Sequence, residues 1–196
     1  MTTTTVHPIP GFPTTYLIEG ADRITIRPMV PSDGDQLLEF FERVPVEDRF
    51  FLKEDVTSKK VIDRWVESLD YGRALPLLAL IGGRIIGNGT LLHHRGGSRR
   101  HIGEARIVDE PEYRNKSVGR GLLHMLVDIA KDKKLEKLMF ELVSDAEEAA
   151  KHTAEVLGFT PVAALADHVR DYCGGKHDLI LMEKTLFTAE TDVNML

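Results

Sequence analysis

The stretch from Glu112 to Gly121 constrains this chain most, because it joins an expected strand to an expected helix. Residues 101–109 favour a strand that Pro111 breaks, and apolar side chains recur at helical spacing from about 118 to 133. An apolar run at 138–143 then indicates a buried strand. This order indicates one α+β or mixed α/β domain.

A strand, two helices and a hairpin are expected before this stretch. The strand covers 24–27, Ser32 and Asp35 form a helix-start signature, and Ser58 can cap the second helix. Gly82-Gly83 separates two apolar runs and predicts a tight turn between paired strands.

A helix and two strands are expected after residue 143. Ser144 and Glu147 form a second capping box, and Gly158 ends the helix. The last two strands lie near 161–169 and 178–186. We therefore expect an N-terminal arm at 1–22, one domain at 23–187 and a C-terminal tail at 188–196.

Charge and cysteine content exclude several classes of protein. The formal charge of −6 argues against general nucleic-acid binding, and no apolar run approaches the roughly 20 residues of a membrane helix. Cys173 is the only cysteine, so no internal disulfide forms and a reducing, cytoplasmic setting is expected. His93, His94 and His101 flank one turn without a metal-binding motif, so no metal is expected.

The turn after residue 112 is basic within an acidic protein. Arg114, Lys116 and Arg120 supply three positive charges, and the first N–H groups of a helix lack internal partners. A phosphate suits such a turn, and a tight connection with solvated basic side chains is the alternative. The P-loop and the dinucleotide fingerprint are excluded, because Asn115 and His124 stand where glycines are required.

This turn resembles motif A of the GCN5-related N-acetyltransferases, which reads Arg/Gln-x-x-Gly-x-Gly/Ala. Here it reads Arg114-x-x-Ser117-x-Gly119. Leu157-Gly158-Phe159 is similar to the family's second motif, and the resemblance covers about residues 22–187. It implies a central, mostly antiparallel sheet flanked by about four helices.

The resemblance implies that acetyl-CoA donates an acetyl group to a primary amine, which attacks the thioester directly. The acceptor is a small molecule or a protein lysine, and Arg49-Phe50-Phe51 is similar to members that act on protein lysines. Backbone N–H groups would hold the pyrophosphate, and a strand would pair with the pantetheine arm. The residues assigned to the cofactor in this way are Ile107, Val108, Asp109, Arg114, Asn115, Lys116, Ser117, Val118, Gly119 and Arg120.

Two departures from the family pattern concern the cofactor. Ser117 replaces the first motif glycine, although its N–H still donates. Asp109 and Glu110 are acids close to the expected pyrophosphate, which is unfavourable unless they point away.

Glu104 is the candidate general base. A lysine-like amine has a pKa of about 10.4, so only about one molecule in 2,500 is neutral at pH 7, and a base is valuable. The alternative is a solvated carboxylate that faces Arg106 or Arg99, and His101 is the second candidate base.

The family's usual general acid is missing from this sequence. Ala154 stands where many members have the Tyr that protonates the leaving thiolate, and Glu147 stands where many have an Asn. Tyr172 is a candidate replacement acid, with an ordinary turn tyrosine as the alternative. These departures leave open a second class, a non-catalytic acyl-CoA-binding or sensing module. The oligomeric state is also left open, with a homodimer as one alternative.

Overall fold

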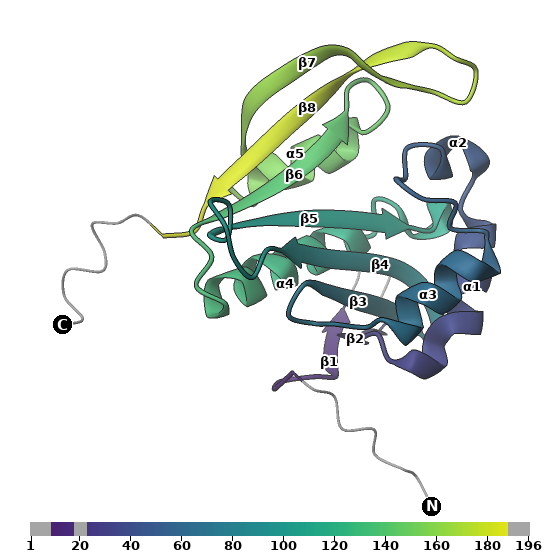
Figure 1. Ribbon diagram of the computed structural model, residues 1–196. Helices are drawn as coiled ribbons and strands as arrows, with labels where there is room; N and C mark the ends of the chain where they lie inside the picture. The colour runs from purple at the N-terminus through teal and green to yellow at the C-terminus, as the bar shows by residue number, and fades with distance from the viewer. Residues whose placement is uncertain (1–8, 18–22, 188–196) are drawn as a thin grey trace, which may run out of the picture.

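An eight-stranded sheet forms the centre of the protein in the computed structural model, which describes residues 9–17 and 23–187 (Figure 1). The strands lie in the order β1 (Thr14–Leu17), β2 (Arg23–Pro28), β3 (Ala74–Ile81), β4 (Arg84–His93), β5 (Ile102–Asp109), β6 (Lys137–Val143), β8 (Lys176–Thr185) and β7 (Thr160–Arg170).

Five α-helices and two short 3₁₀ turns accompany the sheet in the described residues. They are η1 (Pro31–Asp33), α1 (Gly34–Arg43), α2 (Val46–Arg49), α3 (Lys59–Glu67), η2 (Pro111–Tyr113), α4 (Val118–Asp132) and α5 (Glu148–Val156). The expected element order is confirmed, with β1 and the one-turn α2 added. Strand β1 lies within the segment expected to be an arm.

Every strand pair is antiparallel except β5 with β6. The expected mostly antiparallel sheet is therefore confirmed. The Gly82-Gly83 turn joins β3 to β4 with φ values of 57° and 89°, which glycine adopts without strain.

The sheet is covered on both faces, so β3 is buried throughout its middle. Leu75, Leu77 and Ala79 pack in the core on the α4 and α5 face. Leu78 and Leu80 pack on the opposite face with α1 and α3. Because successive side chains of β3 point to opposite faces of the sheet, the strand contributes to two separate hydrophobic cores.

The first helix start differs from the sequence prediction. Asp33, not Ser32, organises it, because its carboxylate accepts the Val30 N–H at 2.7 Å and pairs with Arg27 at 2.7 Å. Ser58 does precede α3, but its side chain makes no capping hydrogen bond.

The predicted Ser144–Glu147 capping box does not form. The Ser144 N–H donates to the Asp178 carbonyl at 2.9 Å, and Glu147 instead accepts the Val143 N–H at 2.6 Å. Because the Ser144 N–H is bonded to β8, Ser144 is held next to that strand and does not cap the helix. Helix α5 therefore begins later, at Glu148. Gly158, with φ 83°, follows the helix as predicted.

None of the helices in residues 9–17 and 23–187 is long and apolar enough to cross a membrane.

Candidate active site

Strands β5 and β6 separate from each other part of the way along. They pair from Ile102–Lys137 to Ala105–Phe140, yet β5 continues to Asp109 and β6 to Val143 without further pairing. On its other side β5 stays paired with β4 as far as Asp109. The backbone groups of 106–109 that point away from β4 therefore have no strand partner, as at a sheet edge.

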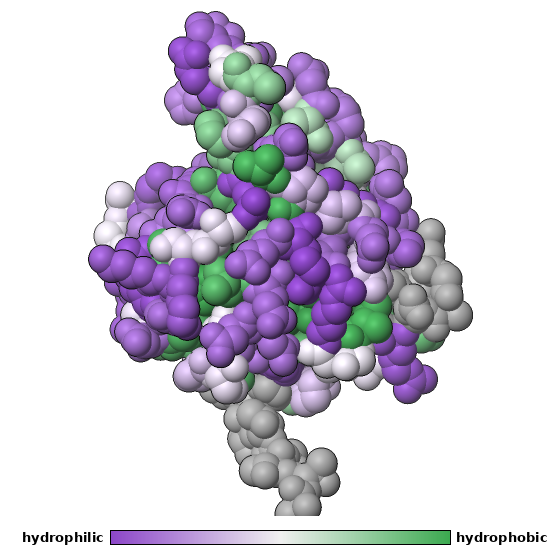
Figure 2. Space-filling view, turned by 90° about the vertical axis from the view of Figure 1, so that its right-hand side faces the viewer, coloured by the Kyte–Doolittle hydropathy of each residue, from purple (hydrophilic) through white to green (hydrophobic). Residues whose placement is uncertain are grey.

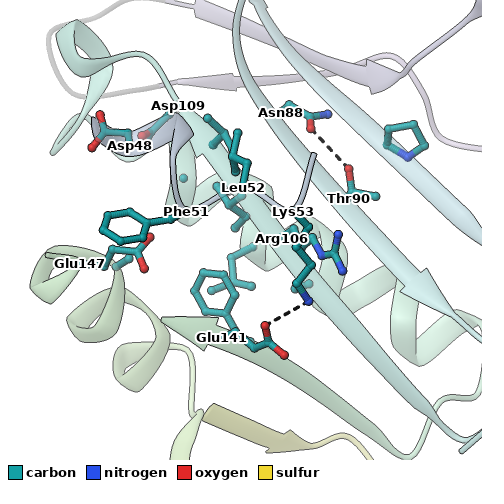
Figure 3. A pocket seen from close by; sticks show the side chains of 18 of the residues that line it. Asp48, Phe51, Leu52, Lys53, Asn88, Thr90, Arg106, Asp109, Glu141 and Glu147 are labelled. Atoms are coloured by element: carbon teal, nitrogen blue, oxygen red, sulfur yellow. Dashed lines mark hydrogen bonds and ion pairs between the residues drawn. The ribbon is translucent and has the colours of Figure 1, made fainter. Parts of the chain in front are cut away.

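A cleft of about 1230 Å³ opens where the two strands separate, and its walls include α2, α4, α5, β4 to β7 and the loop before α4. Typical small-molecule pockets measure about 300–1,000 Å³, so this one has room for a large ligand and a second reactant. Figure 3 shows side chains from both separated strands facing this space. Figure 2 shows a mainly hydrophilic surface at the α1–α3 end, broken by small apolar patches.

The loop before α4 presents several backbone N–H groups without acceptors. Asn115 and Ser117 have φ values of 58° and 69°. Within the described residues, the N–H groups of Ser117, Val118 and Gly119 have no hydrogen-bond acceptor, and Gly121 is the first to bond, to the Ser117 carbonyl at 2.9 Å. A run of free N–H groups at a helix N-terminus is suited to an anion.

The φ of Ser117 explains why a glycine is usual at this position of the motif. The left-handed region costs a non-glycine residue roughly 1 kcal/mol or more, which glycine avoids. Ser117 therefore adopts a left-handed conformation at the position where the motif has glycine.

Lys116 differs from its neighbours in the loop. Its N–H donates to the Tyr113 carbonyl at 3.3 Å, and its ammonium lies 5.2 Å from the centre of the Tyr113 ring. It is absent from the residues that line the cleft, whereas Asn115, Ser117 and Arg120 are among them.

The Arg114 guanidinium is already paired with carboxylates. It contacts Asp48 of α2 at 2.7 Å and Asp109 of β5 at 3.5 Å, and Arg114 is about 40% exposed. Its positive charge therefore faces the cleft while being partly neutralised.

Two half-buried carboxyls lie beside the loop. Burial raises the pKa of Asp109, Arg114 opposes that shift, and Asp48 adds to it. Burial also raises the pKa of Glu147, whose bond from the Val143 N–H lowers it less. Both groups are therefore more easily protonated than ordinary carboxyls.

Glu110, the other acid of concern, points away from the loop. Its side chain is 3% exposed and pairs with Arg43 at 2.6 Å and Arg84 at 2.7 Å. Of the two acids next to the expected pyrophosphate, only Asp109 faces the loop.

Glu104 lies on β5 directly beside the point where the strands separate. Its carboxylate accepts a hydrogen bond from Arg106 at 2.8 Å and contacts the Lys53 ammonium at 3.2 Å. Burial raises the pKa of Glu104, but Arg106 and then Lys53 outweigh it, and the pKa falls below its usual value. Glu104 is therefore ionised at neutral pH and able to accept a proton.

Two charged residues at this place escaped the sequence analysis. Lys53, in the connection from α2 to α3, lies 3.2 Å from Glu141 of β6, as the dashed line in Figure 3 marks. Glu141 is the one charged residue in the apolar run 138–143, a signal that could have identified it. Lys53 lies in a segment without a motif, so no local pattern marks it.

The structure does not bring Tyr172 to the cleft. Tyr172 is 58% exposed and its ring packs edge-on against Phe50 at 6.0 Å. With the Phe51–His177 pair at 6.4 Å, this contact joins the β7–β8 hairpin to the segment after α2 (Figure 1). Tyr172 therefore has a packing role here.

Two other residues singled out in the sequence also lie away from the cleft lining. Ala154 is fully buried in the core, and its neighbour Thr153 lines the cleft instead. His101 is absent from the lining, and its carbonyl accepts the Glu136 N–H at 2.9 Å. His168 of β7 is the imidazole that does line it.

No cluster of three or more His, Cys, Asp or Glu side chains suitable for a metal ion occurs in the residues described.

Comparison with known proteins agrees with this geometry. The family model for the acetyltransferase (GNAT) family matches residues 37–159, more than half of the chain. No curated protein sequence matches. An acetyltransferase of the GNAT family from Streptococcus pneumoniae is similar in structure, with a TM-score of 0.71 and 25% identity over 83% of this chain and 99% of that one.

Two further solved structures share the fold. One is yncA from Salmonella typhimurium, a putative acetyltransferase solved with acetyl-CoA, with a TM-score of 0.73 and 20% identity over 84% of this chain and 95% of that one. The other is the GNAT domain of PAT from S. lividans, with a TM-score of 0.73 and 19% identity over 88% of this chain and 96% of that one.

The chain therefore belongs to the acetyltransferase (GNAT) family. It is an acetyltransferase that depends on acetyl-CoA, and the expected fold and enzyme class are confirmed.

Proposed function

We propose that this enzyme transfers the acetyl group of acetyl-CoA to a positively charged primary amine, with Glu104 as the general base. The observation that carries the proposal is the meeting of three features in one cleft. These are the free N–H groups before α4, the unpaired stretch of β5 and the Glu104 carboxylate.

The donor would bind along the line from the loop to the separation of the strands. Its diphosphate would accept hydrogen bonds from the N–H groups of 117–119, and Arg120 would add positive charge. Its pantetheine amides would pair with the free backbone edge of 106–109. That edge leads toward Glu104, at about 3.3 Å per residue.

The acceptor amine would bind next to Glu104. It arrives mainly as an ammonium, so a nearby ionised carboxylate both attracts it and accepts its proton. The neutral nitrogen then attacks the thioester carbonyl. The leaving thiol has a pKa of about 8.5, so its thiolate is a tolerable product without a protein acid.

The cleft wall beyond Glu104 combines apolar side chains with two acids, Glu54 and Asp70. Leu52, Trp65, Leu69 and Leu92 line it while partly exposed, and Asn88 and Thr90 of β4 supply polar atoms. These features favour an amine attached to an apolar body, such as an arylalkylamine or a lysine with apolar neighbours. A polyamine would leave this wall uncovered.

The test is release of CoA thiol from acetyl-CoA in the presence of a panel of amines. The panel contains an arylalkylamine, a polyamine, free amino acids and lysine peptides, and mass spectrometry identifies the amide. Glu104→Gln should reduce kcat/KM about 10²–10⁴-fold, as expected for loss of a general base.

Glu183→Gln is the matched control. Glu183 lies on β8, pairs with Lys137 at 2.7 Å and does not line the cleft. Equal activity in Glu104→Gln and Glu183→Gln would rule out Glu104 as the base. Failure of every amine in the panel would rule out the proposed acceptor class.

A further inference from the structure

A lysine of this chain already occupies the place that an acceptor amine needs. The Lys53 Nζ lies 3.2 Å from Glu104 Oε1 and 3.2 Å from Glu141 Oε2. The two carboxylates come from β5 and β6, on either side of the separation. One ammonium thus bridges the two strands inside the cleft.

The distance to Glu104 is what a general base requires. A base must lie within about 2.6–3.2 Å of the group whose proton it removes, or reach it through one water. Lys53 satisfies this before any other amine enters. A nucleophile tethered in such a geometry also gains the large advantage of an intramolecular reaction.

We propose that Lys53 is itself an acetyl acceptor, so that the enzyme acetylates its own chain. This inference rests on the proposed function of the cleft. Lys53 gives a proton to Glu104, and its nitrogen attacks the thioester carbonyl of acetyl-CoA. The new N–C bond forms and the C–S bond breaks, so CoA leaves as the thiolate. The nitrogen then gives up its second proton, which the thiolate takes up, and Lys53 becomes a neutral amide.

Acetylation at Lys53 changes the charge of the cleft. Glu104 keeps its bond from Arg106, but Lys53 is the one cation paired with Glu141 among the described residues. A neutral amide therefore leaves Glu141 uncompensated. An external ammonium should then bind more tightly, so acetylation at Lys53 prepares the cleft for a cationic acceptor.

Lys59 provides a matched control on the same chain. Its Nζ also lies between two carboxylates, 3.3 Å from Asp35 and 2.9 Å from Asp63, and its side chain is comparably exposed. It does not line the cleft. Asp63 and Asp35 raise the pKa of Lys59, which disfavours chemical acetylation there, so an excess of label on Lys53 counts as transfer in the cleft only where loss of Glu104 removes it.

The experiment incubates the full chain with ¹³C-labelled acetyl-CoA and no other amine, and then maps labelled lysines by peptide mass spectrometry. The label separates groups transferred in the tube from those acquired during expression. Labelling of Lys53 should exceed that of Lys59 at least about tenfold, as an intramolecular reaction predicts. The half-time of Lys53 labelling should not depend on protein concentration, because donor and acceptor meet within one chain.

Glu104→Gln should slow labelling of Lys53 about 10²-fold and leave Lys59 unchanged. If that variant does not fold, an excess of unlabelled CoA, which competes for the cleft, should slow labelling of Lys53 in the wild type and leave Lys59 unchanged. A second readout is the KM of Lys53→Gln for a cationic amine, which should fall about fivefold or more, since one unit of positive charge is lost beside Glu141.

The outcomes separate this inference from the proposed function. If external amines are acetylated while Lys53 is unlabelled, labelled like Lys59, or labelled at a rate proportional to protein concentration, acetylation within one chain is overturned and the proposed function stands. If neither Lys53 nor any amine of the panel receives a labelled acetyl group from acetyl-CoA, the proposed function fails as well.

Discussion

The Asp48 carboxylate accepts a hydrogen bond from the Arg114 guanidinium at 2.7 Å, which ties α2 to the basic loop before α4 across 66 residues of sequence. Asp48 also contributes to the raised pKa values of Asp109 and Glu147. This pair therefore sets how much positive charge the loop offers to an anion.

Removing the negative charge of Asp48 should strengthen CoA binding. Asp48→Asn frees the Arg114 guanidinium and removes one acid from the expected phosphate site. The expected gain is about fivefold in affinity, equivalent to about 1 kcal/mol, and it should shrink at high salt. Isothermal titration calorimetry with CoA at two salt concentrations measures it.

Glu47→Gln is the control for this prediction. Glu47 is the neighbouring acid of α2 and is exposed. A gain of the same size in Glu47→Gln would show that the effect comes from net charge and not from the Arg114 contact.

The affinity for the diphosphate should rise as pH falls from about 7.5 to 5.5. Burial raises the pKa of Asp109 and of Glu147, so these carboxyls take up protons in this direction, and a bound anion raises their pKa values further. Protonation removes repulsion, so binding takes up protons. Calorimetry with dephospho-CoA, which lacks the separately titrating 3′-phosphate, measures the trend.

Asp109→Asn should bind more tightly at pH 7.5 and show a weaker pH dependence. Glu147 keeps its raised pKa in the variant, so part of the pH dependence should remain. A pH dependence identical to that of the wild type would mean that Asp109 is not the group responsible.

Much of the fold could be predicted from local patterns, because apolar alternation and glycine turns act over a few residues. Gly82-Gly83 and Gly158 both end elements as expected. The first strand outside the expected domain, β1, has only four residues and pairs with β2, so its formation depends on a partner and not on its own pattern.

The basic loop at 112–121 was visible in the sequence, whereas most of the charged network was not. Asp48 and Lys53 lie in a segment without periodicity, and their contacts join distant parts of the chain. Burial of single helix residues was also beyond the sequence pattern. Adjacent helix residues point about 100° apart, so Ala154 lies in the core while its neighbour Thr153 lines the cleft.

The acidic limb of the pH–rate profile should depend on Arg106. Burial raises the pKa of Glu104, and the Arg106 and Lys53 contacts bring it below the usual value. Arg106→Met removes the larger of these two contacts and keeps an apolar stem. The pKa of Glu104 should then rise, and the limb of kcat/KM that requires its ionised form should move to higher pH.

Profiles of kcat/KM from pH 3.5 to 8 test this shift, because the wild-type limb lies below the usual value of 4.5. Arg99→Met is the control, because Arg99 is an exposed cation just before β5 that makes no contact with Glu104. An unmoved limb in Arg106→Met would mean that a group other than Glu104 controls it.

Gly103 of β5, immediately before Glu104, lies against three leucine side chains, which come from β4, β6 and the connection between α4 and β6. A Cβ there would lie 2.9 Å from Leu135, 3.0 Å from Leu91 and 3.1 Å from Leu138, and all three side chains are buried. Gly103→Ala should therefore lower the free energy of unfolding by about 1–3 kcal/mol, as expected for overpacking. Because Gly103 pairs with Leu138 across the parallel β5–β6 contact, the strain falls in the paired part of the two strands, two residues before their last pair, Ala105–Phe140.

Gly96→Ala supplies the comparison, since a Cβ at Gly96 meets no atom within 4 Å. Urea denaturation of both variants should show a loss confined to Gly103→Ala, with no change in the slope of free energy against urea. If Gly103→Ala is as stable as the wild type, the three leucine side chains can shift to admit a methyl group. The core beneath Glu104 is then less rigid than its close packing indicates. In that case the position of Glu104 would depend on its contacts with Arg106 and Lys53 rather than on the core beneath it.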